Sequence, residues 1–174
     1  MKKFFTVALL LLSISSFGQT FEKSEVYVLD STYNKSIIYS KCLEWIGKNF
    51  NSAQNVIQVS DKDAGKIIVK GLLLSLPKSG YFGNLSHGTY FTLDIAIKDG
   101  KCKVIVSNLY VIFEPNIRNE PKKGLKYSYD DIVENGIPYY CKDKCKDIYK
   151  KEIEKEVFDV FTSIQIFLKT KSDF

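Results

Sequence analysis

The sequence predicts an α+β domain in which an antiparallel sheet is covered on one face by two helices, in the order β-α-β-β-β-β-α. Apolar residues recur at helical spacing over about 33–50 and over 149–168, on either side of a run of β-rich segments. Within that run, Asp99-Gly100 separates two segments of alternating apolar and polar residues, which is typical of a β-hairpin. With 174 residues, 45% hydrophobic and 26% charged, the chain has the composition of a globular protein and the length of one domain.

The first eighteen residues have the pattern of a secretory signal peptide. Lys2 and Lys3 give a basic start, an apolar run covers 4–12, and 13–18 is rich in small residues. The apolar run is much shorter than the ~20 residues that span a bilayer. An uncleaved anchor or a buried first helix is the alternative. We expect cleavage after Gly18, export to a periplasm or secretion, and no membrane span in the processed protein.

Residues 19–174 are then expected to form one α+β domain, with an extended 114–147 insertion before the C-terminal helix. Loss of Lys2 and Lys3 lowers the net charge from +5 to +3. Such a mild basic excess does not indicate a nucleic-acid-binding protein.

The N-terminal part predicts a strand and then a helix. The strand is expected over 25–29 and the helix over 33–50, with Trp45 at the edge of its apolar stripe. Asn49 and Asn51 are the candidate ends of this helix. Three residues between the two elements are candidate N-caps: Asp30, Ser31 and Thr32.

Two strands are expected next, over 56–59 and 66–74, joined by turn residues at 61–65. Gly71, inside the second strand, predicts either a bulge or a close approach of the backbone to a neighbour.

The Asp99-Gly100 hairpin gives the clearest local prediction. A two-residue Asp-Gly loop suits a type I′ turn, which needs positive φ at both positions and pairs Ile97 with Cys102. That register places seven apolar residues on one buried face: Phe91, Leu93, Ile95, Ile97, Cys102, Val104 and Val106. Ile105 and Leu109 are then expected on the more polar face.

Two helices are predicted near the C-terminus. Residues 129–135 form a short helix closed by Gly136. A longer helix carries an apolar stripe, which Phe158, Ile166 and Phe167 are expected to widen; its residues are Tyr149, Ile153, Val157, Val160, Phe161, Ile164 and Leu168.

The element order and several stretches resemble a family of exported bacterial proteins of unknown function with a TBP-like (TATA-box-binding-protein-like) fold. The resemblance covers about residues 29–113. The stretches are 42–46 on the first helix, 56–68 across the first hairpin, and 90–101 up to the Asp-Gly turn. This resemblance implies a fold and an exported protein. It implies no activity, because none is assigned to the family.

The four cysteines fall into two groups. Cys141 and Cys145 have a spacing that permits a disulfide on a helix or turn, with free thiols or a redox pair as the alternatives. A metal site made of these two with His87 lacks a fourth ligand. Cys42 and Cys102 are expected to be buried free thiols.

The sequence has no recognisable catalytic motif, so we expect no catalytic residue, no metal and no cofactor. The loop 75–88 supplies the weak candidates for ligand binding, Tyr81, Phe82 and His87. His87 would act as a general base only with a carboxylate or thiol in hydrogen-bond reach.

Tyrosines gather in 114–142, and two interpretations follow. Either this segment lies across the polar sheet face and forms a second small core there, which we favour, or it leaves an open aromatic surface for a partner.

The first hypothesis for function is a non-enzymatic exported module that binds another envelope protein, through the sheet face or the Tyr81–His87 loop. The alternative is a carrier of a small apolar ligand held between sheet and helices. An enzyme that uses His87 is the weakest hypothesis. The sequence leaves the oligomeric state open.

Overall fold

The computed structural model describes residues 21–73, 88–113, 125–136 and 143–170. These ranges contain six strands and four helices: β1 (Glu22–Val28), α2 (Lys35–Asn49), α3 (Ala53–Val56), β2 (Ile57–Asp61), β3 (Lys66–Leu73), β4 (Thr89–Lys98), β5 (Lys101–Phe113), β6 (Leu125–Ser128), α4 (Tyr129–Asn135) and α5 (Asp143–Lys169). The expected α+β class is confirmed. The one-turn helix α3 and the strand β6 are additions to the expected order.

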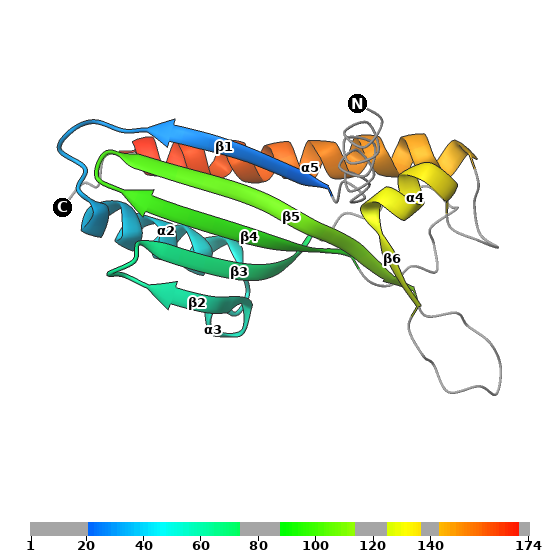
Figure 1. Ribbon diagram of the computed structural model, residues 1–174, viewed down its shortest axis with the longest axis horizontal. Helices are drawn as coiled ribbons and strands as arrows, with labels where there is room; N and C mark the ends of the chain where they lie inside the picture. The colour runs from blue at the N-terminus through cyan, green and yellow to red at the C-terminus, as the bar shows by residue number, and fades with distance from the viewer. Residues whose placement is uncertain (1–20, 74–87, 114–124, 137–142, 171–174) are drawn as a thin grey trace, which may run out of the picture.

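The strands form one antiparallel sheet in the order β1-β5-β4-β3-β2. Strand β6 pairs with the far end of β5, beyond the part that pairs with β1. Helices α2 and α5 lie behind the sheet in Figure 1, and no described helix lies on the near face. Both helices therefore cover the same face, as the sequence predicts.

The β4–β5 hairpin has the predicted register, with Ile97 opposite Cys102, and all seven apolar residues of its predicted inner face are buried. The turn type is wrong, however, because Gly100 has φ +64° while Asp99 has no positive φ. The connection before α2 holds this turn. The Asp99 carboxylate accepts a hydrogen bond from Lys35 N (2.7 Å), and Gly100 N donates to Tyr33 O (2.9 Å).

A bulge in β5 changes which side chains of that strand are buried. Asn108 and Leu109 together lie opposite the single residue Phe91, because the pairing shifts by one residue between Ser107 and Tyr110. Asn108 takes φ +54°, a left-handed conformation that Asn tolerates better than most residues. Leu109 thereby turns into the core and is 3% exposed. The prediction that it lies on the polar face is wrong.

Helix α2 begins later than the candidate caps predict. Asn34 is its N-cap, and the Asn34 side chain accepts a hydrogen bond from Ile37 N at 2.9 Å. The helix ends at Asn49, as expected. Trp45 lies inside the buried stripe, 3% exposed, and its indole N–H donates to Ser163 Oγ of α5 at 3.1 Å.

Helix α5 begins at Asp143, inside the segment predicted as an insertion. Its predicted stripe is buried except for Val160, which is half-buried. Phe158 and Ile166 are 63% and 62% exposed, so the prediction that they widen the stripe is wrong. Each follows a stripe residue by one or two positions, which turns it by about 100° or 200° away from the core. No helix in the described ranges is both long and apolar enough to cross a membrane.

Residues 125–136 extend the two existing layers. Strand β6 lengthens the sheet, and α4 starts with a capping box in which Ser128 and Asp131 each bond the other's backbone N–H. The helix ends at Gly136 (φ +72°), as predicted. Tyr129 packs against Tyr149 of α5 with ring centroids 6.0 Å apart. The interpretation that 114–142 covers the polar sheet face is therefore wrong for 125–136, and the rest of that segment lies outside the described residues.

Gly71 marks a close approach, and the β3–β4 register shows no bulge there. A Cβ atom at this position would lie 2.5 Å from the Phe91 ring and 2.7 Å from the Phe50 ring. The glycine therefore makes room for two aromatic rings of the core.

We expect Asn108→Val to destabilise the fold by about 1–2 kcal/mol, because a β-branched side chain is strained in the left-handed region. Asn108→Gly should be tolerated. Urea-induced unfolding followed by circular dichroism measures both. Ser107→Val is the matched control, since residue 107 is in an ordinary strand position. An Asn108→Val variant as stable as the unmodified protein would show that the strand carries no such bulge.

Candidate functional site

The candidates proposed from the loop and from the paired cysteines lie outside the described residues. These are Tyr81, Phe82, His87 and Cys141, together with the side chain of Cys145. Their roles stay predictions. In the part of the chain that the structure describes, no three His, Cys, Asp or Glu side chains are grouped so that they could hold a metal ion.

Cys42 of α2 and Cys102 of β5 meet in the core as free thiols, as expected. A hydrogen bond between the two thiols, reinforced by burial, raises the pKa of Cys42 far above its usual range. The reactive thiolate form is therefore suppressed at neutral pH.

The outward face of the sheet, which we call the open face, is not covered by any of the described helices (Figure 1). Strands β3 and β4 alternate strictly between buried and half-buried or exposed residues, which fixes the side chains that belong to it. At its centre the Lys66 ammonium lies 2.6 Å from the Asp94 carboxylate. Asp94 stands between Ile68 of β3 and Ile105 of β5, which gives the centre an apolar surround.

The open face carries more positive than negative side chains among the described residues. The register and the alternation place three acids on it: Glu22, Asp61 and Asp94. They place twice as many lysines there: Lys66, Lys70, Lys98, Lys101, Lys103 and Lys126. The open face is therefore basic, and it attracts acidic surfaces.

Aromatic side chains occupy one end of the open face. Tyr90 and Tyr110 stack with ring centroids 5.0 Å apart and planes 10° from parallel. Lys126 of β6 lies with its ammonium 3.8 Å from the Tyr110 ring centroid, which is a cation–π contact. The bulge at Asn108 makes this cluster possible, because it places Tyr110 opposite Tyr90.

A hollow of about 370 Å³ lies between the sheet and the two long helices, beyond the end of α2. Trp45, Phe50 and Phe91 contribute aromatic rings, while Glu156 and Asp159 of α5 contribute carboxylates. We call it the aromatic hollow.

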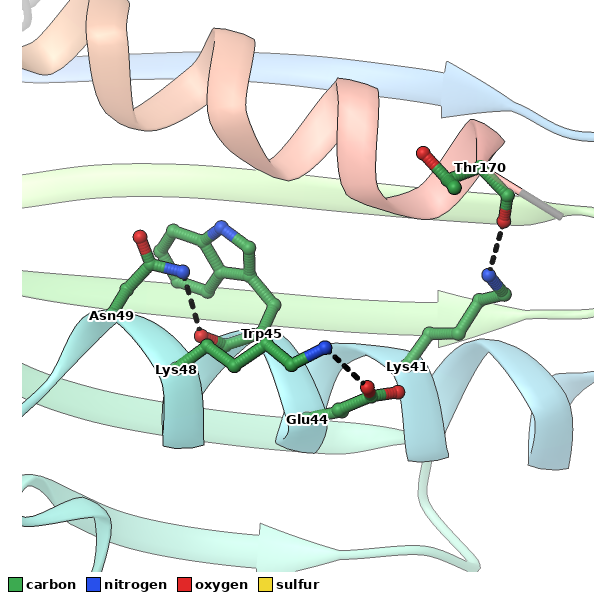
Figure 2. A network of polar contacts seen from close by, with 6 residues as sticks. All are labelled: Lys41, Glu44, Trp45, Lys48, Asn49 and Thr170. Atoms are coloured by element: carbon green, nitrogen blue, oxygen red, sulfur yellow. Dashed lines mark hydrogen bonds and ion pairs between the residues drawn. The ribbon is translucent and has the colours of Figure 1, made fainter. Parts of the chain in front are cut away.

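A larger hollow of about 740 Å³ lies at the opposite end of α2. It is bounded by the end of β1, the connection 29–34, α2 and the last turn of α5. Figure 2 shows Lys41 reaching from α2 to the end of α5, where its ammonium donates to Thr170 O at 2.6 Å. We call it the Lys41 hollow.

The sequence signals only part of these surfaces. The alternation of β3 and β4 predicts a two-sided sheet, and an open face follows if nothing covers the outer side. No signal marks Lys41, because a lysine at a buried helical position looks in sequence like one on a solvated helix face.

Comparison with family models places residues 26–111 in a domain of unknown function with a TBP-like fold, DUF4468. The chain carries a DUF4468 domain. The match agrees with the resemblance over 29–113 that the sequence shows by itself.

Two crystal structures have the same fold. A TBP-like protein from Parabacteroides distasonis is 18% identical, with a TM-score of 0.54, and the alignment covers 84% of this chain and 93% of that one. A DUF4468 family protein from Bacteroides ovatus is 16% identical, with a TM-score of 0.58 and coverage of 89% and 90%. At this identity the likeness shows the fold alone. No curated protein matches the sequence.

The DUF4468 match covers residues 26–111, so it includes α2, α3, β2 to β4 and most of β5, but only the last three residues of β1. Strand β6, α4 and α5 follow it in the chain. The DUF4468 segment therefore contains nearly all of the open face, whereas each of the two hollows also needs residues of α5.

We expect Cys42 and Cys102 to resist N-ethylmaleimide in the folded protein at pH 8 and to react once guanidinium unfolds it, because both side chains are buried and the raised pKa of Cys42 suppresses its thiolate. Mass spectrometry of peptides after labelling measures both sites. Ser40→Cys provides an exposed thiol on the same helix as a positive control. Labelling of Cys42 as fast as the thiol introduced by Ser40→Cys would contradict the buried pair.

Proposed function

We propose that this protein is an exported, non-enzymatic binding module that docks an acidic partner protein of the cell envelope on its open face. The observation that carries the proposal is the basic face that no described helix covers, with stacked tyrosines at one end. The signal-peptide pattern of residues 1–18 supports export.

The composition of the open face favours a protein partner. Ile68 and Ile105 offer half-buried apolar surface at the centre, and Tyr90 with Tyr110 offers the amphipathic aromatic surface on which interfaces rely. The lysines that surround them favour a partner with carboxylates, because complementary charge steers association and fixes orientation. The mild net charge of the chain, +5, argues against a polyanion such as DNA.

The open face can be tested by site-specific photo-crosslinking in the native host. A benzophenone amino acid at Ile105 should give one crosslinked partner, identifiable by mass spectrometry. The same probe at Lys155, exposed on α5, is the matched control and should not crosslink that partner. Lys103→Glu should lower the crosslinked yield by about fivefold or more, because it opposes the partner's charge. Lys155→Glu should not change it.

Two outcomes would contradict this function. An Ile105 probe that gives no adduct, or the same adducts as the Lys155 probe, would show that the open face is not the docking surface. An adduct with nucleic acid would show that the open face binds a different class of macromolecule, not an acidic protein.

The aromatic hollow favours a second candidate function, a carrier of a small apolar ligand. It lies between the sheet and helices, where such a ligand is expected, and its 370 Å³ fall within the range of about 300–1,000 Å³ that small-molecule sites have. Three aromatic rings and Val160 form its apolar wall.

Trp45 is the single tryptophan of the chain and lines this hollow, so its fluorescence reports on it. The neutral probe N-phenyl-1-naphthylamine should quench Trp45 emission with saturation. Val160→Phe, which fills the hollow, should weaken binding about tenfold, equivalent to about 1.4 kcal/mol. Ile148→Phe, elsewhere on α5, should not. Emission that stays unchanged or falls without saturation would rule the carrier out.

A further inference from the structure

The Lys41 hollow is lined by a buried lysine side chain, Lys41. Lys41 is 7% exposed, although lysines on amphipathic helices ordinarily keep their ammonium in water. Burying a charge costs several kcal/mol unless opposite charge or hydrogen bonds compensate it. The contacts of this ammonium therefore decide whether it is satisfied within the described structure.

Those contacts compensate Lys41 only in part. Its ammonium has three N–H donors, and Thr170 O is the one acceptor that they contact among the described residues. The rings of Tyr33 and Phe167 lie 5.6 and 5.8 Å away, which adds weak cation–π attraction. The described residues place no carboxylate within ion-pair distance of it, whereas Lys48, two turns along the same helix, pairs with Glu44 at 2.7 Å. Figure 2 shows the two lysines and their different partners.

The hydrogen bond from Lys41 to Thr170 O also caps the end of α5, and this capping role is distinct from a role in ligand binding. Thr170 follows α5, whose last carbonyl groups carry partial negative charge and need donors. Lys41 supplies one of those donors. One carbonyl dipole does not neutralise a full positive charge, so the ammonium retains capacity for an anion.

The rest of the hollow is apolar with a positive balance. Val28, Leu29 and Ile37 form an apolar wall, and Ile37 is exposed. Lys169 adds a second positive charge. Asp30 also lines the hollow, and its carboxylate accepts hydrogen bonds from Thr32 N (3.0 Å) and Ser31 Oγ (3.4 Å) within its own turn.

We infer that the Lys41 hollow binds a small amphipathic carboxylate, with the carboxylate at the Lys41 ammonium and its hydrocarbon chain along the apolar wall. The volume of about 740 Å³ lies within the range of small-molecule sites. A plain anion would leave the apolar wall exposed, and a neutral hydrocarbon would leave the buried ammonium uncompensated. A carboxylate on a hydrocarbon chain matches both features. This site uses none of the charged residues of the open face or of the aromatic hollow.

The test is isothermal titration calorimetry of the purified protein with three probes of equal chain length: decanoate, decanol and decyltrimethylammonium. Decanoate is expected to bind at least tenfold more tightly than either of the others, because it alone presents an anion to Lys41. Equal affinity for all three would mean that the hollow recognises only hydrocarbon. Tighter binding of decyltrimethylammonium would mean that Asp30, and not Lys41, determines which charge the hollow accepts. Either result would overturn the proposal.

Variants separate a binding role from the capping role. Lys41→Met keeps the side chain long but removes its charge, and should weaken decanoate binding at least tenfold while leaving decanol unchanged. Lys41→Arg should retain decanoate. Lys48→Met, on the same helix but outside the hollow, is the matched control and should bind decanoate as the unmodified protein does.

A second variant covers the case in which Lys41→Met unfolds the protein. Ile37→Asp puts a carboxylate on the exposed apolar wall, four residues before Lys41 on the same helix, where it repels decanoate and competes with it for the ammonium. Decanoate binding should fall while thermal melting stays close to that of the unmodified protein. Unchanged decanoate binding in both Ile37→Asp and any folded Lys41→Met would overturn the proposal. Photo-crosslinking from Ile105 is unaffected by these substitutions, so failure here is distinguishable from failure of the docking function.

Discussion

The structure depends on one constraint: the inner face of an antiparallel sheet must be covered by two helices of different length. Helix α5, with 27 residues, is about 40 Å long and matches the 13-residue strand β5, at about 44 Å. Helix α2, with 15 residues, reaches only about 22 Å. Tyr129 and Ile132 of α4 pack beside α5 and supply part of the missing cover. The aromatic hollow lies where α2 ends, and the Lys41 hollow lies where α2 begins beside the end of α5.

The bulge at Asn108 links the two faces of the sheet. A regular β5 would alternate from Val106 to Asn108 and Tyr110 on the inner face, so a tyrosine would have to enter the core. The extra residue instead sends Leu109 and Val111 inward, and both are buried. Tyr110 is left on the open face, stacked on Tyr90. One left-handed residue therefore serves the core and the candidate docking surface at the same time.

The sequence predicted the features that depend on a periodic pattern of apolar residues or on a capping residue. It did not predict the single turn, helix start and bulge described above. The hairpin register, the buried stripe of α5 and the short helix 129–135 follow from periodicity and capping, and the structure confirms them. The prediction for the Asp99 turn was wrong because long-range hydrogen bonds hold that turn: Lys35 N and Tyr33 O bind it from another part of the chain. The start of α2 was wrong for a local reason, because Asn34 caps the helix instead of one of the three residues before Tyr33. The bulge has no local signal, since Asn108 is also an ordinary residue for an exposed strand position. Of the surfaces, alternation predicted a sheet with one buried and one more polar face, although the favoured interpretation placed 114–142 across the polar face. No pattern distinguishes Lys41 from Lys48.

Lys41 and Lys48 differ in burial, and a buried charge points to a binding role more strongly than an exposed one because its burial costs free energy. Lys48 and Glu44 form an exposed pair four residues apart, which contributes a few tenths of a kcal/mol and has no bearing on function. Lys41 lies two turns before Lys48 on nearly the same side of the helix, and both ammonium groups lie near the Phe167 ring, but only Lys41 is buried. An apolar residue at position 41 would pack at no electrostatic cost. Capping α5 offsets only part of the desolvation penalty, because a single hydrogen bond to a charged donor contributes about 1.5–3 kcal/mol against a cost of several kcal/mol per buried ion. An anion that completes the contacts of this ammonium would offset the remaining desolvation cost. Because the wall beside the ammonium is apolar, that anion should also have a hydrocarbon chain.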